Sequence, residues 1–289
     1  YYEEYRKAGI ETEPFLKLAF PALTSRINYR NHRKIVVIDG RIGYVGGMNV
    51  ADRYIHGFEW GCWRDTHARI EGKGVQGLQS AFLLDWYFVS QTLITSRKYF
   101  PALGIYGNIP MQIVESGPLK EENGIPFGIL QAIYNAKKSI FIQTPYFLPP
   151  DAMIKALHAA AIRGVDVRIM LSERSDMQLV QLASRSYIQE MLENGAKIYF
   201  YKKGFLHSKL MVFDDSLTLI GSANFDSRSL EQNFEIGAFI YDEETGKQAR
   251  RIFIADQHDC EQIFLKNWIK RPSLERFFES CVRLFVPLL

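Results

Sequence analysis

Two short segments of the chain carry a histidine and a lysine at a spacing suited to phosphoryl transfer. Both follow the pattern His-x-Lys-x4-Asp, and their residues are His32, Lys34, Asp39, His207, Lys209 and Asp214. A lysine places positive charge against phosphate oxygens. A histidine can attack phosphorus or carry a proton, because its pKa lies near neutral. We predict that these six residues belong to one catalytic site for phosphodiester transfer.

The two segments are copies of one another, as an alignment of His32 with His207 shows. In that single register three further pairs match, namely Gly46 and Gly221, Asn49 and Asn224, and Arg53 and Arg228. The stretches between the matched positions are apolar in both copies and predict strands over residues 35–38, 42–45, 210–213 and 217–220. We infer an internal duplication, with the motifs spanning residues 27–54 and 202–229.

Side-chain parity separates the lysines from the aspartates. Successive side chains of a strand point to opposite faces, so His32 and Lys34 share a face. Asp39 comes five residues after Lys34 and points the other way, and the second copy repeats this spacing. We therefore predict that the lysines face the substrate and that each aspartate occupies a turn that supports its strand. One bulge would reverse this assignment.

Small and amide residues follow the second predicted strand of each copy, and we predict that they bind substrate. These residues are Asn49, Asn224, Gly47 and Ser222. An asparagine amide can donate hydrogen bonds to phosphate oxygens as charge develops on them. A small residue lets the backbone approach the phosphate closely.

A catalytic histidine is oriented by a carboxylate on its second ring nitrogen. Asp65 follows His32 and Glu235 follows His207 at similar separations along the chain. These similar separations favour Asp65 as the orienting group in the first copy and Glu235 in the second. The alternative for each carboxylate is an ordinary surface salt bridge.

Two facing histidines can divide the reaction between them. One attacks phosphorus to give a phosphohistidine while the other protonates the leaving oxygen, and the second then takes a proton from the incoming alcohol or water. The sequence shows no Asp/His cluster of the kind that two-metal phosphodiesterases use. We therefore expect neither a metal nor another cofactor.

The composition is that of a globular protein with a sizeable core, since 47% of the 289 residues are hydrophobic and 23% are charged. The net charge of +3 is too small to indicate a nucleic-acid binder. Asp85 interrupts the most apolar run, residues 81–90, and no run reaches the roughly 18 residues that a membrane span needs. The chain opens on Tyr1 inside a helix-like stretch, so we expect a fragment whose first repeat lacks its early strands.

Before the second motif, predicted helices over residues 128–136 and 152–163 alternate with predicted strands over residues 139–144 and 166–171. This alternation predicts an α/β fold in which helices flank a mixed sheet. Glycine and proline cluster at residues 104–110. We therefore divide the chain into a first, incomplete repeat over residues 1–110 and a second repeat over residues 111–289, with one active site between the two lobes.

With the glycine and asparagine that follow them, the two motifs resemble the paired signatures of the phospholipase D superfamily. Four further stretches resemble bacterial cardiolipin synthases, namely residues 28–31, 63–67, 143–149 and 283–289. Members of that family usually begin with one or two membrane-spanning helices, which this chain lacks. The resemblance implies two α/β lobes around one site, with His32 as the nucleophile and His207 as the acid and base.

The resemblance also implies a reaction and its partners. A phosphatidyl group would pass from one phosphatidylglycerol to another, giving cardiolipin and glycerol, at an anionic phospholipid membrane that is the inner membrane of a bacterium. Aromatic residues in 81–88 and at Phe277 and Phe278 would contact the lipid headgroups or the core. The alternatives are a lipid hydrolase that uses water as acceptor, a nuclease, which the modest charge disfavours, and a lobe pair without activity. We expect no nucleic-acid partner.

Overall fold

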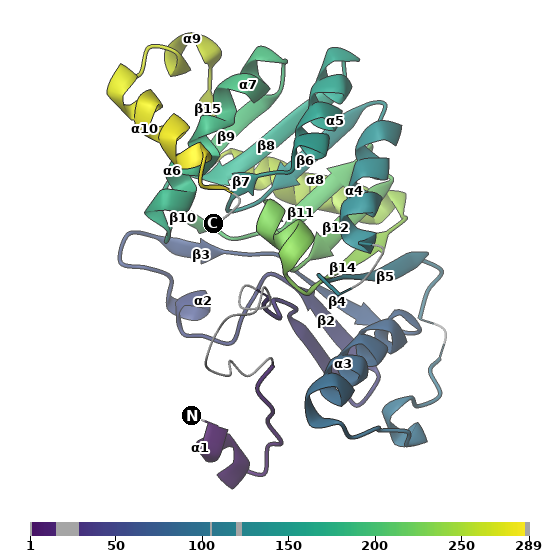
Figure 1. Ribbon diagram of the computed structural model, residues 1–289. Helices are drawn as coiled ribbons and strands as arrows, with labels where there is room; N and C mark the ends of the chain where they lie inside the picture. Colours follow the sequence, from purple (N-terminus) through teal and green to yellow (C-terminus); the bar gives the residue numbers. More distant parts are fainter. Residues whose placement is uncertain (1, 16–28, 105, 120–122, 287–289) are drawn as a thin grey trace.

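The computed structural model describes residues 2–15, 29–104, 106–119 and 123–286. Figure 1 shows the first repeat, coloured purple to blue, below a larger lobe that the second repeat forms. Among the described residues, no helix is long and apolar enough to cross a membrane.

The larger lobe is built on an eight-stranded mixed sheet in the order β15-β9-β8-β6-β11-β12-β14-β5. The strands are β5 (Met111–Ser116), β6 (Ser139–Gln143), β8 (Asp166–Ser172), β9 (Lys197–Tyr201), β11 (Leu210–Phe213), β12 (Leu217–Gly221), β14 (Glu235–Ile240) and β15 (Cys260–Ile263). Strands β6, β8 and β9 are parallel to one another, and the other neighbouring pairs are antiparallel.

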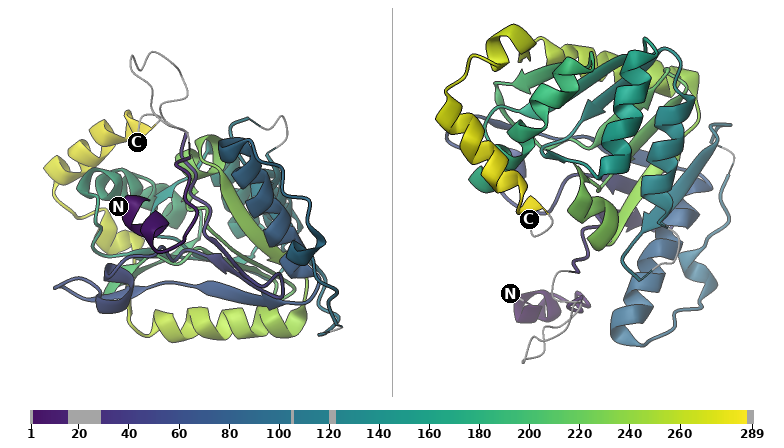
Figure 2. Two further views of the ribbon diagram at one scale, coloured as in Figure 1. Left: turned by 90° about the horizontal axis from the view of Figure 1, so that it is seen from below. Right: turned by 45° about the horizontal axis from the view of Figure 1, so that its top comes forward.

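Helices cover both faces of this sheet, as Figures 1 and 2 show. One face carries α4 (Gly124–Asn135), α5 (Asp151–Ile162), α6 (Gln178–Ser186) and α7 (Ile188–Glu193). The other face carries α8 (Glu243–Gln257), whose Ala249 and Phe253 pack on Phe141 and Val212. Because both faces are covered, strands such as β11 and β14 are buried along their whole length.

The first repeat contributes a smaller antiparallel sheet in the order β1-β2-β4. Its strands are β1 (Ile35–Ile38), β2 (Ile42–Gly46) and β4 (His67–Glu71), and α3 (Gly74–Ser90) packs against them. Val45, Ile70 and Leu78 of this lobe share one buried cluster with Ile236 and Ala238 of β14. The two repeats are therefore joined by a common hydrophobic core.

The hairpins that carry the two motifs have the same strand register. In the first, Ile35 lies opposite Val45, and in the second Leu210 lies opposite Ile220. The alignment of the two copies found in the sequence thus also pairs structurally equivalent positions. This finding confirms the predicted duplication at the level of backbone pairing.

The elements expected before the second motif are present to within a few residues of their predicted bounds. The predicted helices correspond to α4 and α5, and the predicted strands correspond to β6 and β8. The larger sheet begins at Met111, the first residue of β5. The division of the chain at residue 110 stays a prediction.

Shorter elements complete the fold. They are α1 (Tyr2–Lys7), α2 (Arg53–His56), β3 (Cys62–Arg64), a helical turn Arg97–Tyr99, β7 (Phe147–Leu148), β10 (Gly204–Leu206), β13 (Phe225–Asp226), a helical turn Arg228–Gln232, α9 (Leu265–Trp268) and α10 (Ser273–Arg283). Strand β3 of the first repeat pairs in parallel with β10 of the second. An isolated parallel bridge joins Asn31 to Phe234. These two contacts between the repeats position the histidines.

Candidate active site

Backbone pairing between the repeats holds both histidines in the same way. The amide nitrogen of His207 donates to the carbonyl oxygen of Arg64 at 2.7 Å, and that of His32 donates to the carbonyl oxygen of Phe234 at 2.9 Å. In both cases the accepting residue immediately precedes a predicted orienting carboxylate. Each histidine is therefore fixed beside the carboxylate of the other repeat.

The two histidine–carboxylate pairs are crosswise. The Nδ1 atom of His32 lies 2.8 Å from Oε1 of Glu235, and Nδ1 of His207 lies 2.7 Å from Oδ2 of Asp65. The expected pairing within each repeat is wrong, because the parallel ribbons place each carboxylate beside the histidine of the other copy. The alternative of a surface salt bridge is also wrong, since the side chains of Glu235 and Asp65 are 0% and 3% exposed.

This geometry leaves the second ring nitrogen of each histidine available for chemistry. An ionised carboxylate can only accept hydrogen bonds, so the Nδ1 atom of each partner histidine carries the donated proton. A neutral imidazole then keeps its lone pair on Nε2. Burial raises the pKa of Glu235 and of Asp65, but the histidine contacts and the nearby lysines outweigh burial, and the net shift is downward for both.

The residues behind the two carboxylates differ between the repeats. The hydroxyl of Ser222 donates to Glu235, and the amide of Asn233 donates to it at 3.3 Å. The equivalent of Ser222 is Gly47, where a Cβ atom would lie only 2.2 Å from Oδ1 of Asp65. Ser222 and Gly47, which we predicted to bind substrate, thus support the orienting carboxylates: one by a hydrogen bond, the other by leaving space.

Both lysines lie beside their histidines. The Nζ atom of Lys34 donates to the carbonyl oxygen of His32 at 2.5 Å, and Nζ of Lys209 donates to that of His207 at 2.6 Å. Burial lowers the pKa of Lys34 to about 7, although Glu235 opposes the shift. Burial lowers the pKa of Lys209 to about 8. An ammonium group has three donors, so each lysine keeps donors for an anionic ligand.

The two histidines differ in their surroundings. Burial lowers the pKa of His207 to about 3, and the charge of Lys209 adds to this effect. The rings of Tyr54, Trp63 and Phe205 lie around His207, at centroid distances of 5.9, 4.9 and 5.7 Å. The side chain of His32 is 27% exposed, whereas that of His207 is 10% exposed. Before a substrate binds, His207 is therefore a neutral base enclosed by aromatic rings.

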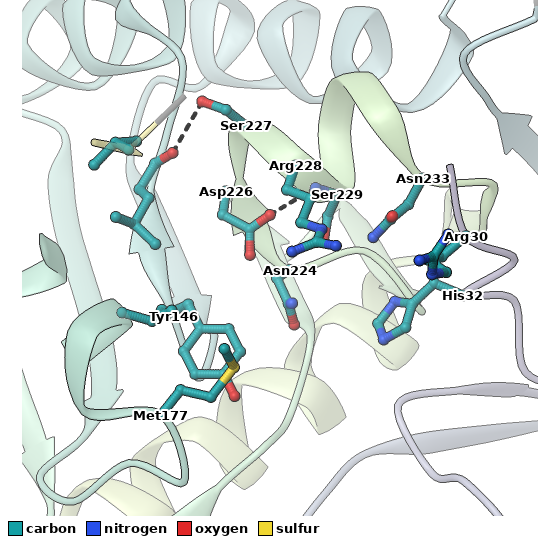
Figure 3. Close-up of a pocket in the computed structure, with 13 residues that line it drawn as sticks. Arg30, His32, Tyr146, Met177, Asn224, Asp226, Ser227, Arg228, Ser229 and Asn233 are labelled. Carbon is teal, nitrogen blue, oxygen red and sulfur yellow. Dashed lines mark hydrogen bonds between the residues drawn. The ribbon is translucent and has the colours of Figure 1, made fainter. Parts of the chain in front are cut away.

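His32 lines a cavity of about 230 Å³, shown in Figure 3. The other lining residues are Arg30, Tyr146, Leu148, Met177, Val180, Asn224, Asp226, Ser227, Arg228, Ser229, Asn233 and Val286. The predicted substrate-binding residue Asn224 belongs to this wall and is buried. Its counterpart Asn49 is exposed, and its amide donates to the hydroxyl of Tyr54 at 2.6 Å. The two asparagines, predicted to play the same role, thus have different places.

The aspartates of the two motifs lie at the opposite ends of their strands from the histidines. Asp39 and Asp214 both adopt a φ of 54°, in the left-handed region that aspartate tolerates in turns. The carboxylate of Asp214 accepts hydrogen bonds from the backbone amides of residues 137, 138 and 139 at 2.8, 2.7 and 2.8 Å. Asp39 is exposed. The count of these two aspartates among the catalytic residues stays a prediction, and their place in turns agrees with the parity of the strands.

Sequence reasoning did not find the aromatic residues around His207 or the carboxyl group of Asp226. Trp63 was visible as the residue two positions before Asp65, which puts both on the same side of an extended segment. Asp226 follows Asn224 by two positions in the same way. Among the described residues, no group of three or more histidine, cysteine or acidic side chains is arranged to hold a metal ion.

Comparison with known proteins shows which proteins this chain resembles. A family described as cardiolipin synthase, phospholipase D-like domain, matches residues 129–257. Cardiolipin synthase 1 of Staphylococcus epidermidis is 43% identical over the whole chain, and the major cardiolipin synthase of Bacillus subtilis is 42% identical. The chain is thus similar to cardiolipin synthases along its whole length, and residues 129–257 resemble their phospholipase D-like domain. It spans 59% and 61% of the length of these two relatives.

A solved structure supports the fold. A phosphatidylserine synthase of Haemophilus influenzae superposes with a TM-score of 0.67, covering 90% of this chain and 69% of that protein, at 15% identity. The likeness extends over both repeats, and at this identity it concerns the fold alone. The predicted α/β fold of two phospholipase D-type lobes, with a mixed sheet and flanking helices, is confirmed.

Proposed function

We propose that the protein is a phosphatidyltransferase that makes cardiolipin from two phosphatidylglycerol molecules and releases glycerol. The observation that carries the proposal is the pair of crosswise histidine–carboxylate contacts, each with a lysine beside it. They occur in a chain that is 42–43% identical over its whole length to cardiolipin synthases.

In the first step, Nε2 of His32 attacks the phosphorus atom of one phosphatidylglycerol. A phosphorus–nitrogen bond forms, the bond to the glycerol oxygen breaks, and His207 gives that oxygen a proton. His32 is assigned as the nucleophile because it lines the cavity and has the more exposed ring. Glu235 stabilises the positive charge that develops on its imidazole, as in other histidine–carboxylate pairs.

In the second step, a headgroup hydroxyl of another phosphatidylglycerol attacks the phosphohistidine. His207 takes the proton of that hydroxyl, the phosphorus–nitrogen bond breaks, and His32 is released with cardiolipin. The low pKa of His207 keeps its imidazole unprotonated in the free protein, so Nε2 can accept this proton. In the first step His207 must carry a proton, and a bound phosphodiester favours this because its negative charge offsets the lysines and raises the pKa of His207.

Lys34 and Lys209 would bind the nonbridging oxygens of the phosphodiester. Each is buried, so its interaction with an anion is screened less than at the surface. Negative charge on the substrate favours the protonated form of both lysines. Together the lysines stabilise the charge that builds up on phosphorus during each transfer.

We also propose an anionic phospholipid membrane, the inner membrane of a bacterium, as the surface on which the protein works. Phe277 and Phe278 of α10 are 61% and 53% exposed, and Leu284 and Phe285 just after it are 79% and 57% exposed. The next residue, Val286, lines the cavity that holds His32. An exposed apolar segment that ends at the cavity suits an enzyme that takes lipids from a bilayer.

The charge near this segment agrees with an anionic surface. Residues 265–286 contain five lysine or arginine residues and two glutamates. The aromatic stretch within α3 gives weaker support, since Ala81 is buried in the shared core while Phe82 and Phe88 are each 43% exposed. Basic residues beside exposed apolar side chains favour binding to anionic lipids.

A product assay tests the function. The intact protein is mixed with phosphatidylglycerol vesicles, and cardiolipin, glycerol and phosphatidic acid are quantified. Cardiolipin and glycerol in equal amounts are expected, with losses far beyond about 10³-fold in His32→Ala and His207→Ala. The exposed His56 supplies the matched control, and His56→Ala should keep wild-type turnover. Phosphatidic acid as the main product would indicate a hydrolase instead, and robust turnover in either histidine variant would contradict the mechanism.

A further inference from the structure

A cavity of about 290 Å³ lies at one end of the larger lobe, where α10 packs against α6 (Figures 1 and 2). Among the described residues, it shares no lining residue with the cavity that holds His32. In the part of the chain that the structure describes, its walls carry three guanidinium groups and one carboxylate, which belong to Arg185, Arg271, Arg276 and Glu279. The proposed reaction gives these charged groups no role.

The charge of Arg271 is compensated within the protein. Its guanidinium donates to both carboxylate oxygens of Glu279, at 2.6 and 2.9 Å, and its Nε atom donates to the carbonyl oxygen of Trp268 at 3.2 Å. The side chains of Arg271 and Glu279 are 17% and 4% exposed. Such a two-pronged, shielded ion pair holds the chain after α9 to α10, so it uses up the one carboxylate of the cavity.

The charges of Arg185 and Arg276 are not compensated. Arg185 is half-buried and its guanidinium lies 5.8 Å from the centroid of the Phe200 ring, but it has no hydrogen bond or ion pair with any described residue. Arg276 donates to the carbonyl oxygen of Ile269 and to the amide oxygen of Gln189, both at 3.3 Å, and both acceptors are neutral. Two like charges that line one cavity repel each other, and an anion bound between them removes that cost.

The chemistry of the cavity selects a phosphate group. A guanidinium presents a planar fork of donors that matches the oxygens of a phosphate, and a phosphate has enough oxygens for two such forks. The first turn of α10 borders the cavity through Ser273, and no side chain caps that end of the helix. The backbone amides of a first turn also favour an anion.

The rim of the cavity on the side of α10 is apolar. Phe277 lines the cavity, and Phe277, Leu274 and Phe278 are all more than half exposed. Because residues three and four apart lie on one helix face, these side chains form a continuous apolar stripe. Exposed apolar surface beside cationic groups is typical of segments that lie in the headgroup region of an anionic bilayer.

We propose that Arg185 and Arg276 form an accessory site for the phosphate group of an anionic phospholipid, separate from the lipid that reacts, with its acyl chains beside Phe277. The choice of a lipid over free phosphate rests on the proposed membrane function, whereas the phosphate site itself does not. Val180 of α6 and Val286, just after α10, line the cavity that holds His32. A lipid held between these two helices would keep the catalytic cavity at the bilayer surface.

Sedimentation with lipid vesicles tests the proposal. The 289-residue chain is mixed with phosphatidylcholine vesicles that contain or lack phosphatidic acid, and the dissociation constant is measured. Phosphatidic acid is anionic and has no headgroup alcohol to transfer, so binding is measured without turnover. The wild-type chain should bind the vesicles with phosphatidic acid much more tightly than the vesicles without it.

The variants Arg185→Gln and Arg276→Gln should each raise this dissociation constant about tenfold or more, as expected for losing a hydrogen bond between charged groups. Arg185→Gln breaks no hydrogen bond or ion pair among the described residues, so its urea denaturation should match that of the wild type. Arg251→Gln is the matched control, because it removes the same charge from an exposed position on α8, on the opposite face of the sheet. It should leave the dissociation constant unchanged.

The possible outcomes separate this site from a general charge effect and from the catalytic proposal. Equal weakening in Arg185→Gln and Arg251→Gln, unchanged binding in both cavity variants, or no preference of the wild type for phosphatidic acid overturns the site. Calorimetric titration with inorganic phosphate covers the other source: binding that depends on Arg185, without any effect of Arg185 on vesicles, overturns the lipid assignment. A chain that binds vesicles as expected but makes no cardiolipin from phosphatidylglycerol overturns the proposed function alone.

Discussion

Replacing Glu235 by glutamine tests the crosswise pairing at a single group. The carboxylate is fully buried and accepts from Nδ1 of His32 at 2.8 Å, from the hydroxyl of Ser222 and from Asn233. Glutamine has nearly the same shape but only one accepting oxygen, and its NH2 group is a donor. It therefore cannot serve both His32 and Ser222 as the carboxylate does.

The expected loss in the rate of phosphohistidine formation follows from the hydrogen bonds that Glu235→Gln removes. A hydrogen bond to a charged group is worth about 1.5–3 kcal/mol, which corresponds to roughly 10–150-fold in rate at 1.36 kcal/mol per factor of ten. If the NH2 group turns toward His32, the imidazole takes the wrong tautomer, and a similar change in serine proteases costs about 10⁴-fold. We expect the phosphohistidine to form about 10²- to 10⁴-fold more slowly in Glu235→Gln.

The assay is a single-turnover measurement of the phosphatidylated enzyme with phosphatidylglycerol vesicles, with Glu231→Gln as the exposed control four positions away. Proton NMR of the imidazole Nδ1–H signals then locates the effect. Glu235→Gln should shift the signal of His32, and Asp65→Asn should shift that of His207. A shift of the His207 signal alone in Glu235→Gln, or a near-wild-type single-turnover rate, would refute the crosswise assignment.

Other predictions concern stability, pH and metals. Asp214→Ala removes the acceptor for three backbone amides and places alanine at a positive φ. The free energy of unfolding, measured by urea denaturation, should therefore fall by about 1–3 kcal/mol, while the folded protein keeps its turnover number. Inorganic phosphate should inhibit less as the pH rises through 7 to 8, because Lys34 and Lys209 lose their protons in that range in the free protein; inhibition that strengthens with pH would contradict this. The unfolded chain binds a proton at His207 near pH 6.5, whereas the folded protein binds it only near pH 3. The free energy of unfolding should therefore fall as the pH drops below 6.5. In His207→Gln, urea titrations should show a weaker dependence of the free energy of unfolding on pH. Chelation by EDTA should leave turnover unchanged, and strong inhibition would indicate a metal requirement.

The sequence alone was sufficient for features that adjacent residues encode. The apolar runs on either side of Asp39 and Asp214 predicted the two hairpins, and the alignment of His32 with His207 reproduced their register. The parity of a strand also placed the lysines on the histidine side and the aspartates in turns. These predictions depend on the periodicity of the backbone, which a few neighbouring residues set.

Repeat symmetry was a poorer guide where the two copies differ. Asn49 and Asn224 match in sequence, yet one amide contacts the hydroxyl of Tyr54 and the other lines the cavity. Gly47 and Ser222 also match, and both ended up behind carboxylates rather than at the predicted substrate site. A side chain's neighbours depend on which lobe surrounds it, and the two lobes differ in size and in their covering helices.

The twin motif could thus be recognised from the sequence alone, because the types and spacing of its histidines and lysines define it. The tertiary structure decided how the copies combine. The partner of His32 is 203 residues away and that of His207 is 142 residues away. Contacts over such separations arise from parallel pairing between the repeats and from their shared core, and no local pattern records which carboxylate will meet which histidine.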